Sequence, residues 1–360
     1  MNKSLKAFIC KIVYSPVGDK VATFLGGERF HAESFVRSEK KKLLAEAKRK
    51  FDKGSSPGSF DDYKQALDKH WVAYSEYAYQ YEFYKKSEEE RNEYVSRLKM
   101  AYFYLRYGPG VLRPLFRDKA RFLKNFNKYV HRQWLYAPEA SFEDFQQLVS
   151  THDCIVKPLD GSRGKGVFKI YKDDPKSDGR EFYEFCVKDK VLLEQCIESC
   201  EELSALHPQS LNTVRVVTFS NKEKACVFSG VLRAGVGDSV IDNSHAGGVS
   251  AQINIQTGVV ESDGVDVHGN RFECHPNSGI RIRGFKIPQW DKIVETCCKV
   301  AMQVGNPITG WDVVINIRGE VEFIEGNHTP DFDVMQMRYK VGLKKRIYAL
   351  IKEYCGVDMA

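Results

Sequence analysis

Beyond Cys154 the chain consists of short apolar runs of β-forming residues, separated by turns that contain glycine. The expected strands are residues 155–157, 167–171, 191–194, 213–219, 225–232, 249–255, 311–315 and 321–324. Helices are expected at residues 288–304 and 340–354. Strands mixed with helices, several of the strands antiparallel, predict an α+β architecture rather than a doubly wound parallel sheet.

The first hundred residues are charged, rich in Lys, Glu, Ala and aromatic residues, and poor in glycine. They predict long amphipathic helices over residues 33–53 and 60–105, interrupted at residues 54–58. Five aromatic residues recur there at helix-compatible spacings: Trp71, Tyr74, Tyr77, Tyr81 and Tyr84. This stripe is interpreted as a helical core, with contact to a lipid-linked or glycan substrate as the alternative. Gly108-Pro109-Gly110 marks the end of a helical N-terminal region, residues 1–108, which is a candidate for acceptor or partner binding.

Composition narrows the class of partner. With 42% hydrophobic and 28% charged residues, the chain can bury a substantial core. A net charge of +6 favours anionic small molecules, and no nucleic-acid-binding motif is present. The ten cysteines form no CxxC or zinc spacing, and no secretory signal precedes residue 30, so a reducing cytoplasmic location is expected. No apolar run reaches the roughly 18 residues that cross a bilayer, so any membrane contact is expected to be peripheral.

Residues 155–167 predict a strand, a glycine-rich turn and a second strand. Gly161, Gly164 and Gly166 would let the backbone approach phosphate oxygens closely. Lys157 would add a point charge at the end of the first strand, and Arg163 and Lys165 would lie at the tip of the turn. The segment is neither a Walker A loop nor a dinucleotide fingerprint, because no helix follows with the required spacing. A solvated hairpin is the alternative.

Near the C-terminus, residues 310–315 and 321–327 predict a hairpin of two apolar strands. Glu325 and Asn327 are two residues apart and therefore share a face, and Asp312 on the partner strand can point the same way. Two carboxylates and an amide oxygen are hard ligands that suit Mg²⁺ shared with substrate phosphates. A hairpin with ordinary polar faces is the alternative, but Asp and Glu are poor strand formers within apolar strands.

Taken in order, these segments resemble the ATP-grasp superfamily. The resemblance rests on Lys119, Lys157-Pro158 with its glycine loop, residues 192–197, Asp312, and Glu325-Gly326-Asn327. Residues 211–215, 242–248 and 309–312 look like the sugar-transfer-associated branch, which is often linked to bacterial surface-polysaccharide synthesis. The similarity covers roughly residues 110–350, and the first hundred residues resemble no family.

The resemblance implies two α+β lobes that clamp ATP, with residues 109–360 as the catalytic region. Its expected parts are residues 109–153 (first lobe), 154–198 (lid and central lobe) and 199–360 (C-terminal metal-binding lobe). In the implied nucleotide site, Lys119 and Lys157 contact phosphates and Glu201 contacts the ribose. The lid over the phosphates comprises Gly161, Ser162, Arg163, Gly164, Lys165 and Gly166. The hinge that faces adenine comprises Glu194, Gln195 and Ile197. Asp312, Glu325 and Asn327 would hold Mg²⁺, with Mn²⁺ as an alternative, and Arg215 and Arg233 would stabilise charge on the transferred phosphoryl group.

Three departures from the family pattern concern the acceptor more than the nucleotide. Gln195 stands where many relatives have an acidic residue, His328-Thr329-Pro330 replaces a different small-residue loop, and Arg163 with Lys165 makes the lid unusually basic.

Relatives of this fold usually activate a carboxylate as an acyl phosphate and join it to an amine. The first expectation is therefore an ATP-dependent ligase acting on a small-molecule carboxylate or sugar acceptor. The second is a kinase that phosphorylates a sugar or small alcohol, and the third is a nucleotide-binding regulator of glycan assembly. His245 would either orient the acceptor or act as a base, or else only cap a turn. The sequence does not indicate an oligomeric state.

Overall fold

In this computed structural model the described residues are 27–159, 166–172, 174, 179–239, 247–266, 268–332, 335–337 and 340–359. Their contacts divide the chain into two compact units, residues 1–111 together with 331–360, and residues 112–330. The sequence had placed residues 331–360 in the metal-binding lobe, whereas they pack into the helical unit. None of the helices within the described ranges is long and apolar enough to cross a bilayer.

The helical unit contains α3 (Gly27–Phe51), α4 (Phe60–His70), α5 (Glu88–Asn92), α6 (Arg97–Tyr107) and α14 (Lys344–Cys355), with short turns at Glu76–Gln80, Phe83–Lys85 and Gly110–Leu112. The prediction of long helices across residues 60–105 is therefore wrong. Trp71 ends α4 with a φ of 61°, and Glu82 has a φ of 53°. A right-handed helix cannot continue through such left-handed residues, so this stretch folds back as several short pieces.

The folded-back pieces enclose an aromatic core. Tyr63, Tyr77, Tyr81 and Phe83 are fully buried, and Tyr74 is 3% exposed. Their rings meet edge-on or tilted, as in the 5.4 Å contact between Tyr63 and Tyr77. The core interpretation of the aromatic stripe is thus confirmed for its three central tyrosines.

Specific hydrogen bonds hold the C-terminal segment in this unit. The side chain of Gln336 accepts from the Val95 N–H at 2.9 Å and donates to the Val95 carbonyl at 2.8 Å. The Tyr94 hydroxyl donates to the Lys340 carbonyl at 2.5 Å. These pairs join residues more than 240 positions apart, so local sequence patterns carry no sign of them.

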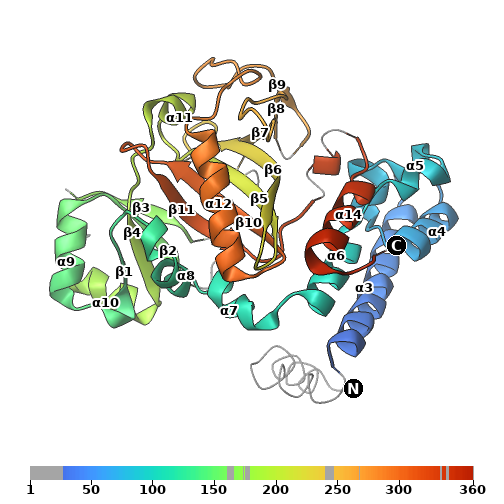
Figure 1. Cartoon of the computed structure of the whole chain (residues 1–360), viewed down its shortest axis with the longest axis horizontal. Coiled ribbons are helices and arrows are strands. Elements are labelled where there is room, and N and C mark those ends of the chain that lie inside the picture. The colour runs from blue at the N-terminus through green and yellow to red at the C-terminus, as the bar shows by residue number, and fades with distance from the viewer. Residues whose placement is uncertain are drawn as a thin grey trace. The chain divides into compact units, whose positions relative to one another are not determined.

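The first of the two sheets in the second unit has four antiparallel strands in the order β1-β4-β2-β3. They are β1 (Trp134–Tyr136), β2 (Cys154–Pro158), β3 (Phe168–Ile170) and β4 (Val191–Gln195). Helices α9 (Phe142–Thr151) and α10 (Arg180–Lys188) cover one face, drawn in green in Figure 1. The buried side chains between them include Phe145, Val156 and Leu193. Ser141 and Asp144 form a capping box that starts α9.

The larger sheet has seven antiparallel strands in the order β11-β10-β5-β6-β7-β8-β9. They are β5 (Thr213–Ser220), β6 (Ala225–Ala234), β7 (Val249–Ile253), β8 (Gly264–Val265), β9 (Arg271–Phe272), β10 (Ile308–Ile315) and β11 (Val321–Asn327). The orange helix α12 (Trp290–Val304) crosses one face of this sheet in Figure 1. It buries Ile293, Cys297 and Val300 there, consistent with Cys297 acting as a small hydrophobe. The cysteines in the described ranges are free thiols.

Shorter helices complete this unit: α7 (Arg113–Arg117), α8 (Lys119–Asn125), α11 (Glu201–Leu206) and the turns Asn127–Tyr129 and Ala137–Glu139. Both α7 and α8 contact β11. Side chains of both helices crowd Gly326, where an added Cβ atom would lie 2.8 Å from the rings of Phe116 and Phe122. A glycine at this position lets the two helices lie directly on the strand that carries Glu325 and Asn327.

Replacing Gly326 with alanine should therefore lower the free energy of unfolding by about 1–3 kcal/mol, because two buried rings must shift to admit the methyl group. Thermal unfolding measures the effect. Gly110→Ala is the matched control, since no heavy atom lies within 4 Å of the added carbon there. Equal melting temperatures for both variants would contradict the close packing of α7 and α8 on β11.

Candidate active site

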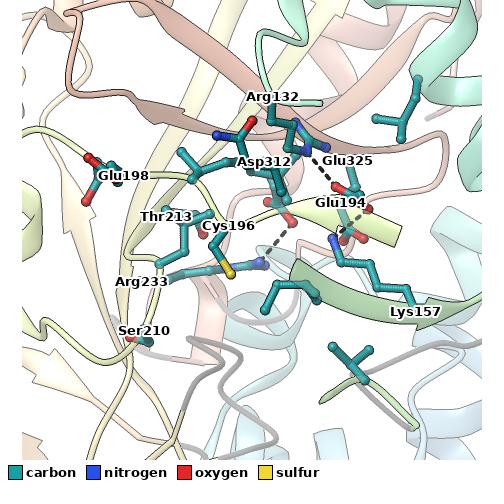
Figure 2. A pocket seen from close by; sticks show the side chains of 18 of the residues that line it. Arg132, Lys157, Glu194, Cys196, Glu198, Ser210, Thr213, Arg233, Asp312 and Glu325 are labelled. Carbon is teal, nitrogen blue, oxygen red and sulfur yellow. Dashed lines mark hydrogen bonds and ion pairs between the residues drawn. The ribbon is translucent and has the colours of Figure 1, made fainter. Parts of the chain in front are cut away.

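A cleft of about 1500 Å³ lies within residues 116–328, between the two sheets. Strands β2, β3 and β4 contribute one wall, and β5, β6, β10 and β11 contribute the other. Helices α7 and α8 and the segment 195–211 close its sides. Figure 2 shows the labelled side chains from both walls pointing toward the same space.

Strand alternation places the first wall's functional residues. Ile155 and Lys157 face the cleft, whereas Cys154 and Val156 belong to the core beneath α9 and α10. Ile155 is paired with Glu194 in the sheet register. As a result the Lys157 ammonium lies 2.8 Å from a carboxylate oxygen of Glu194.

Glu194 is also bound by a residue that the sequence analysis missed. The Arg132 guanidinium donates to Glu194 at 2.5 Å and to Glu322 at 2.9 Å, and all three side chains are at most 4% exposed. Figure 2 shows Arg132 and Lys157 on the same carboxylate. Burial alone would raise the pKa of Glu194, but Arg132 and Lys157 outweigh it and hold the pKa at about 2.

Arg132 connects the two walls, because Glu194 belongs to the four-stranded sheet and Glu322 to β11. One of its guanidinium nitrogens, Nη2, is buried without a hydrogen-bond partner among the described residues. No motif marks this arginine in the sequence. Its partners are 62 and 190 residues away, so only the fold brings the three together.

The predicted hinge lines the cleft, but its first two residues do not offer their backbone groups to it. Glu194 lies in a strand hydrogen-bonded on both sides, to β1 and to β2, so its backbone is used within the sheet. The Gln195 N–H donates to the Gln133 carbonyl at 2.8 Å. Ile197 lines the cleft and makes no backbone hydrogen bond to another described residue. Glu201, at the start of α11, lines the same side.

Lys119 lies at the first turn of α8 and lines the cleft, where its ammonium donates to the Pro158 and Leu159 carbonyls at 3.1 Å each. It therefore holds the end of β2 as well as facing the cavity. Of the predicted lid, only Gly166 is described, and its φ of 75° is in the region that favours glycine. Gly161, Ser162, Arg163, Gly164 and Lys165 lie outside the described residues, and so does the candidate base His245.

On the opposite wall Asp312 is 4% exposed and is held by two arginines. Arg215 binds it through two nitrogens, one of them at 2.6 Å, and Arg233 donates to it at 3.1 Å. Register explains the cluster: Asp312 is opposite Arg215 on β5, and Arg233 is opposite Thr213 two residues earlier on β5. Burial would raise the pKa of Asp312, but the two guanidinium groups hold it well below its ordinary value.

Glu325 is the cross-strand partner of Asp312 and lies 3.7 Å from Arg215. Its side chain keeps 56% of its surface accessible because it faces the cleft. The surrounding protein still desolvates it, and together with the neighbouring Asp312 carboxylate this raises the pKa of Glu325 above its ordinary value. The structure thus brings Asp312 and Glu325 together as the hairpin pattern predicted.

Asn327 lies two residues beyond Glu325, lines the cleft, and accepts from the Thr329 N–H at 2.9 Å. Within the described ranges, no three His, Cys, Asp or Glu side chains are placed to hold a metal ion by themselves. The predicted donor set has only two such side chains, Asp312 and Glu325. Its third donor is the amide oxygen of Asn327. Two carboxylates and an amide that face a cleft fit Mg²⁺, which usually takes further oxygens from water or substrate phosphates.

A basic corner was also missed, where α7 meets the end of β11. It comprises Arg113, Arg117 and His328, and the last two line the cleft. The His328 ring stacks on Phe116 with centroids 5.9 Å apart. Desolvation, then Arg117 and Arg113, lowers the pKa of His328 to about 4. Nothing in the sequence indicates which of these charges face the cavity.

Two antiparallel sheets that enclose a cleft with lysines on one wall and carboxylates on the other define an ATP-grasp fold. The chain matches the family model of sugar-transfer associated ATP-grasp proteins over residues 99–352. It belongs to that family, so the α+β fold class and the family resemblance are confirmed. No curated protein matches the chain.

Solved structures with a similar chain path include a ligase, a synthetase and a carboxylase domain. The ligase PsnB in complex with minimal precursor, Mg and ADP is 15% identical, with a TM-score of 0.43 over 81% of this chain and 74% of that one. An N5-carboxyaminoimidazole ribonucleotide synthetase from Thermotoga maritima is 14% identical, with a TM-score of 0.37 over 70% and 51%. The biotin carboxylase domain of Hydrogenobacter thermophilus 2-oxoglutarate carboxylase is 12% identical, with a TM-score of 0.41 over 65% and 46%.

Proposed function

We propose that this protein is a Mg²⁺-dependent ligase that uses ATP to activate a carboxylate as an acyl phosphate and joins it to an amine. The observation that carries the proposal is a single cleft with Lys157 on one wall and Asp312 and Glu325 on the other. Phosphoryl transfer needs this combination, because catalysis consists mainly of positioning the phosphates and neutralising their charge.

The nucleotide would lie along the four-stranded sheet. Lys157 and Lys119 would contact its phosphates, Ile155 and Val167 would give an apolar surface for the base, and the 195–201 segment would face adenine and ribose. Glu194 fixes the direction of the Lys157 side chain through their 2.8 Å ion pair. This constraint lowers the entropy cost of placing the lysine against a phosphate.

The reaction would proceed in two displacements. A carboxylate oxygen of the acceptor attacks the γ-phosphorus, the bond to the β,γ-bridging oxygen breaks, and ADP leaves with that electron pair. The amine then attacks the acyl carbon, loses a proton, and displaces inorganic phosphate. Arg215 and Arg233 would hold Asp312 in place and present positive charge to the transferred group. Mg²⁺, when held by Asp312, Glu325 and Asn327, would supply further neutralisation of phosphate charge.

A kinase acting on a sugar or small-alcohol hydroxyl is the second candidate, since the same cleft could direct the γ-phosphate to a hydroxyl. The products separate the two reactions. With a carboxylate labelled with ¹⁸O and an amine present, a ligase releases inorganic phosphate that contains one ¹⁸O atom from the carboxylate. A kinase produces ADP and a phosphorylated acceptor without releasing phosphate. Mass spectrometry of the phosphate distinguishes these outcomes, and ADP formation without any acceptor product would oppose both.

The setting that we propose is the synthesis of capsule or other surface polysaccharide in the cytoplasm. Support comes from the family to which residues 99–352 belong, whose description associates it with sugar transfer. A small-molecule carboxylate or sugar acceptor fits a cleft of about 1500 Å³, which exceeds the roughly 300–1,000 Å³ of an ordinary ligand pocket.

Lys157→Ala should weaken nucleotide binding by about 10- to 100-fold, because one charge-assisted hydrogen bond to a phosphate contributes about 1.5–3 kcal/mol. Calorimetric titration with a non-hydrolysable ATP analogue and Mg²⁺ measures the loss. Lys188→Ala, at the end of α10 and outside the cleft lining, is the control. An unchanged affinity in Lys157→Ala would remove this lysine from the phosphate site.

A further inference from the structure

The basic corner at the end of β11 is not explained by nucleotide or metal binding. Arg113 and Arg117 are four residues apart on α7 and therefore project from the same side of the helix. Their neighbour Lys119 donates to two backbone carbonyls. Neither arginine, in contrast, has a side-chain hydrogen bond or ion pair with any residue that the structure describes.

The packing of α7 directs this charge toward the cleft. Gly326 admits the Phe116 ring against β11, and Phe116 stacks on His328. Arg117 follows Phe116 directly and lines the cavity together with Asn327 and His328. The corner therefore adjoins the wall that carries Glu325.

Three other cationic side chains near the cleft form ion pairs with carboxylates. Arg215 and Arg233 are both held by Asp312, and Lys157 is held by Glu194. At the corner, Arg117 lines the cleft and Arg113 lies one helical turn before it, and neither forms an ion pair with a described carboxylate. An anion carrying about two negative charges, such as a phosphate monoester at neutral pH, complements such a pair better than a single carboxylate does.

We propose that this corner binds a phosphoryl group of the acceptor, so that the second substrate is a phosphorylated small molecule such as a sugar phosphate. The proposal rests on the proposed function, since it assumes that the nucleotide occupies the other end of the cleft. Arg117 lines the same cleft that the nucleotide would occupy, and this shared cleft favours a soluble phosphate over a lipid headgroup. Arg113 and Arg117 would hold the phosphoryl group by forked hydrogen bonds, and the acceptor's reactive group would extend toward Glu325.

The test measures phosphate binding with the nucleotide site already filled. The full-length protein is saturated with a non-hydrolysable ATP analogue and Mg²⁺, then titrated calorimetrically with inorganic phosphate and with glucose 1-phosphate. The native protein should bind both, and Arg113→Gln/Arg117→Gln should bind them at least about 10-fold more weakly while its affinity for the analogue stays within about twofold. Arg121→Gln/Lys128→Gln removes the same charge from exposed positions nearby and should behave like the native protein.

Several results would overturn the proposal. Unchanged phosphate binding in the Arg113/Arg117 variant would do so, as would acetate binding as tightly as phosphate. An equal loss of analogue affinity would assign the arginines to the nucleotide instead. Binding to vesicles of phosphatidylglycerol and phosphatidylcholine through these arginines, without binding of inorganic phosphate, would assign the corner to a lipid. Failure of the native protein to bind the analogue at all would instead contradict the proposed function. Circular dichroism establishes that each variant is folded.

Discussion

Replacing Glu325 with alanine should reduce Mg²⁺-dependent ATP turnover by about 100-fold or more while leaving the protein folded. Glu325 is the most accessible carboxylate of the candidate donor set, because Asp312 is already bound by Arg215 and Arg233. Loss of its oxygen would leave the candidate metal site with one carboxylate that two cations already occupy. Stabilisation of transferred charge by a metal is worth several kcal/mol, which corresponds to this loss of rate.

The measurement is the rate of ADP formation as a function of Mg²⁺ concentration. Glu325→Gln should restore little activity at ordinary Mg²⁺ concentrations, since an amide lacks the charge that attracts the ion. Glu320→Ala is the control from the same hairpin: its carboxylate binds Arg318 at the turn and does not line the cleft. Near-normal turnover in Glu325→Ala would exclude the metal assignment. A lowered melting temperature would show that the residue acts on stability instead.

Replacing Arg132 with methionine should lower the free energy of unfolding of the 112–330 unit by about 3–5 kcal/mol. The substitution leaves two carboxylates, Glu194 and Glu322, buried without their shared cation, and an uncompensated buried charge is costly. Lys157 remains beside Glu194, but Glu322 loses its only charged partner among the described side chains. Urea unfolding followed by tryptophan fluorescence suits the test, because three of the four tryptophans lie in this unit.

Arg318→Met is the matched control for this prediction. It breaks an Arg–Glu pair at 2.9 Å in which the side chains are 64% and 38% exposed, and exposed pairs contribute only about 0–1 kcal/mol. A combined variant, Arg132→Met with Glu194→Gln and Glu322→Gln, should recover much of the lost stability, because no buried charge is then left alone. A loss below about 1 kcal/mol in Arg132→Met would mean that the triad does not hold the two sheets together.

The two predictions concern residues that differ in how far their partners lie along the sequence. The local pattern was enough to propose Asp312, Glu325 and Asn327 as neighbours, because a hairpin with a short turn fixes which residues are opposite one another. The structure pairs Asp312 with Glu325 in register. Lys157 was proposed in the same way, from its place at the end of a strand before a glycine-rich turn, and it lines the cleft. Local rules suffice where the partners are close in sequence.

Local sequence patterns did not predict structure correctly where distant parts of the chain determine the backbone path. The helical pattern of residues 60–105 continues through Trp71 and Glu82, yet the chain turns at both positions to bury Tyr77 and Tyr81 in an aromatic core. Burial of several aromatic rings outweighs the cost of left-handed backbone at two residues. The composition of the segment therefore predicts helices but does not predict where the chain turns.

The strand pattern, the hairpin and the order of the motifs were enough to determine the α+β class, the family and a set of candidate oxygen ligands. Tertiary structure alone decided what those ligands contact. It pairs Asp312 with two arginines, shares Arg132 between carboxylates 62 and 190 residues away, and places Arg117 at the cleft, one helical turn after Arg113. The physical reason is that backbone periodicity fixes which way a side chain points, whereas its charge balance depends on residues that only the folded chain brings within a few ångströms.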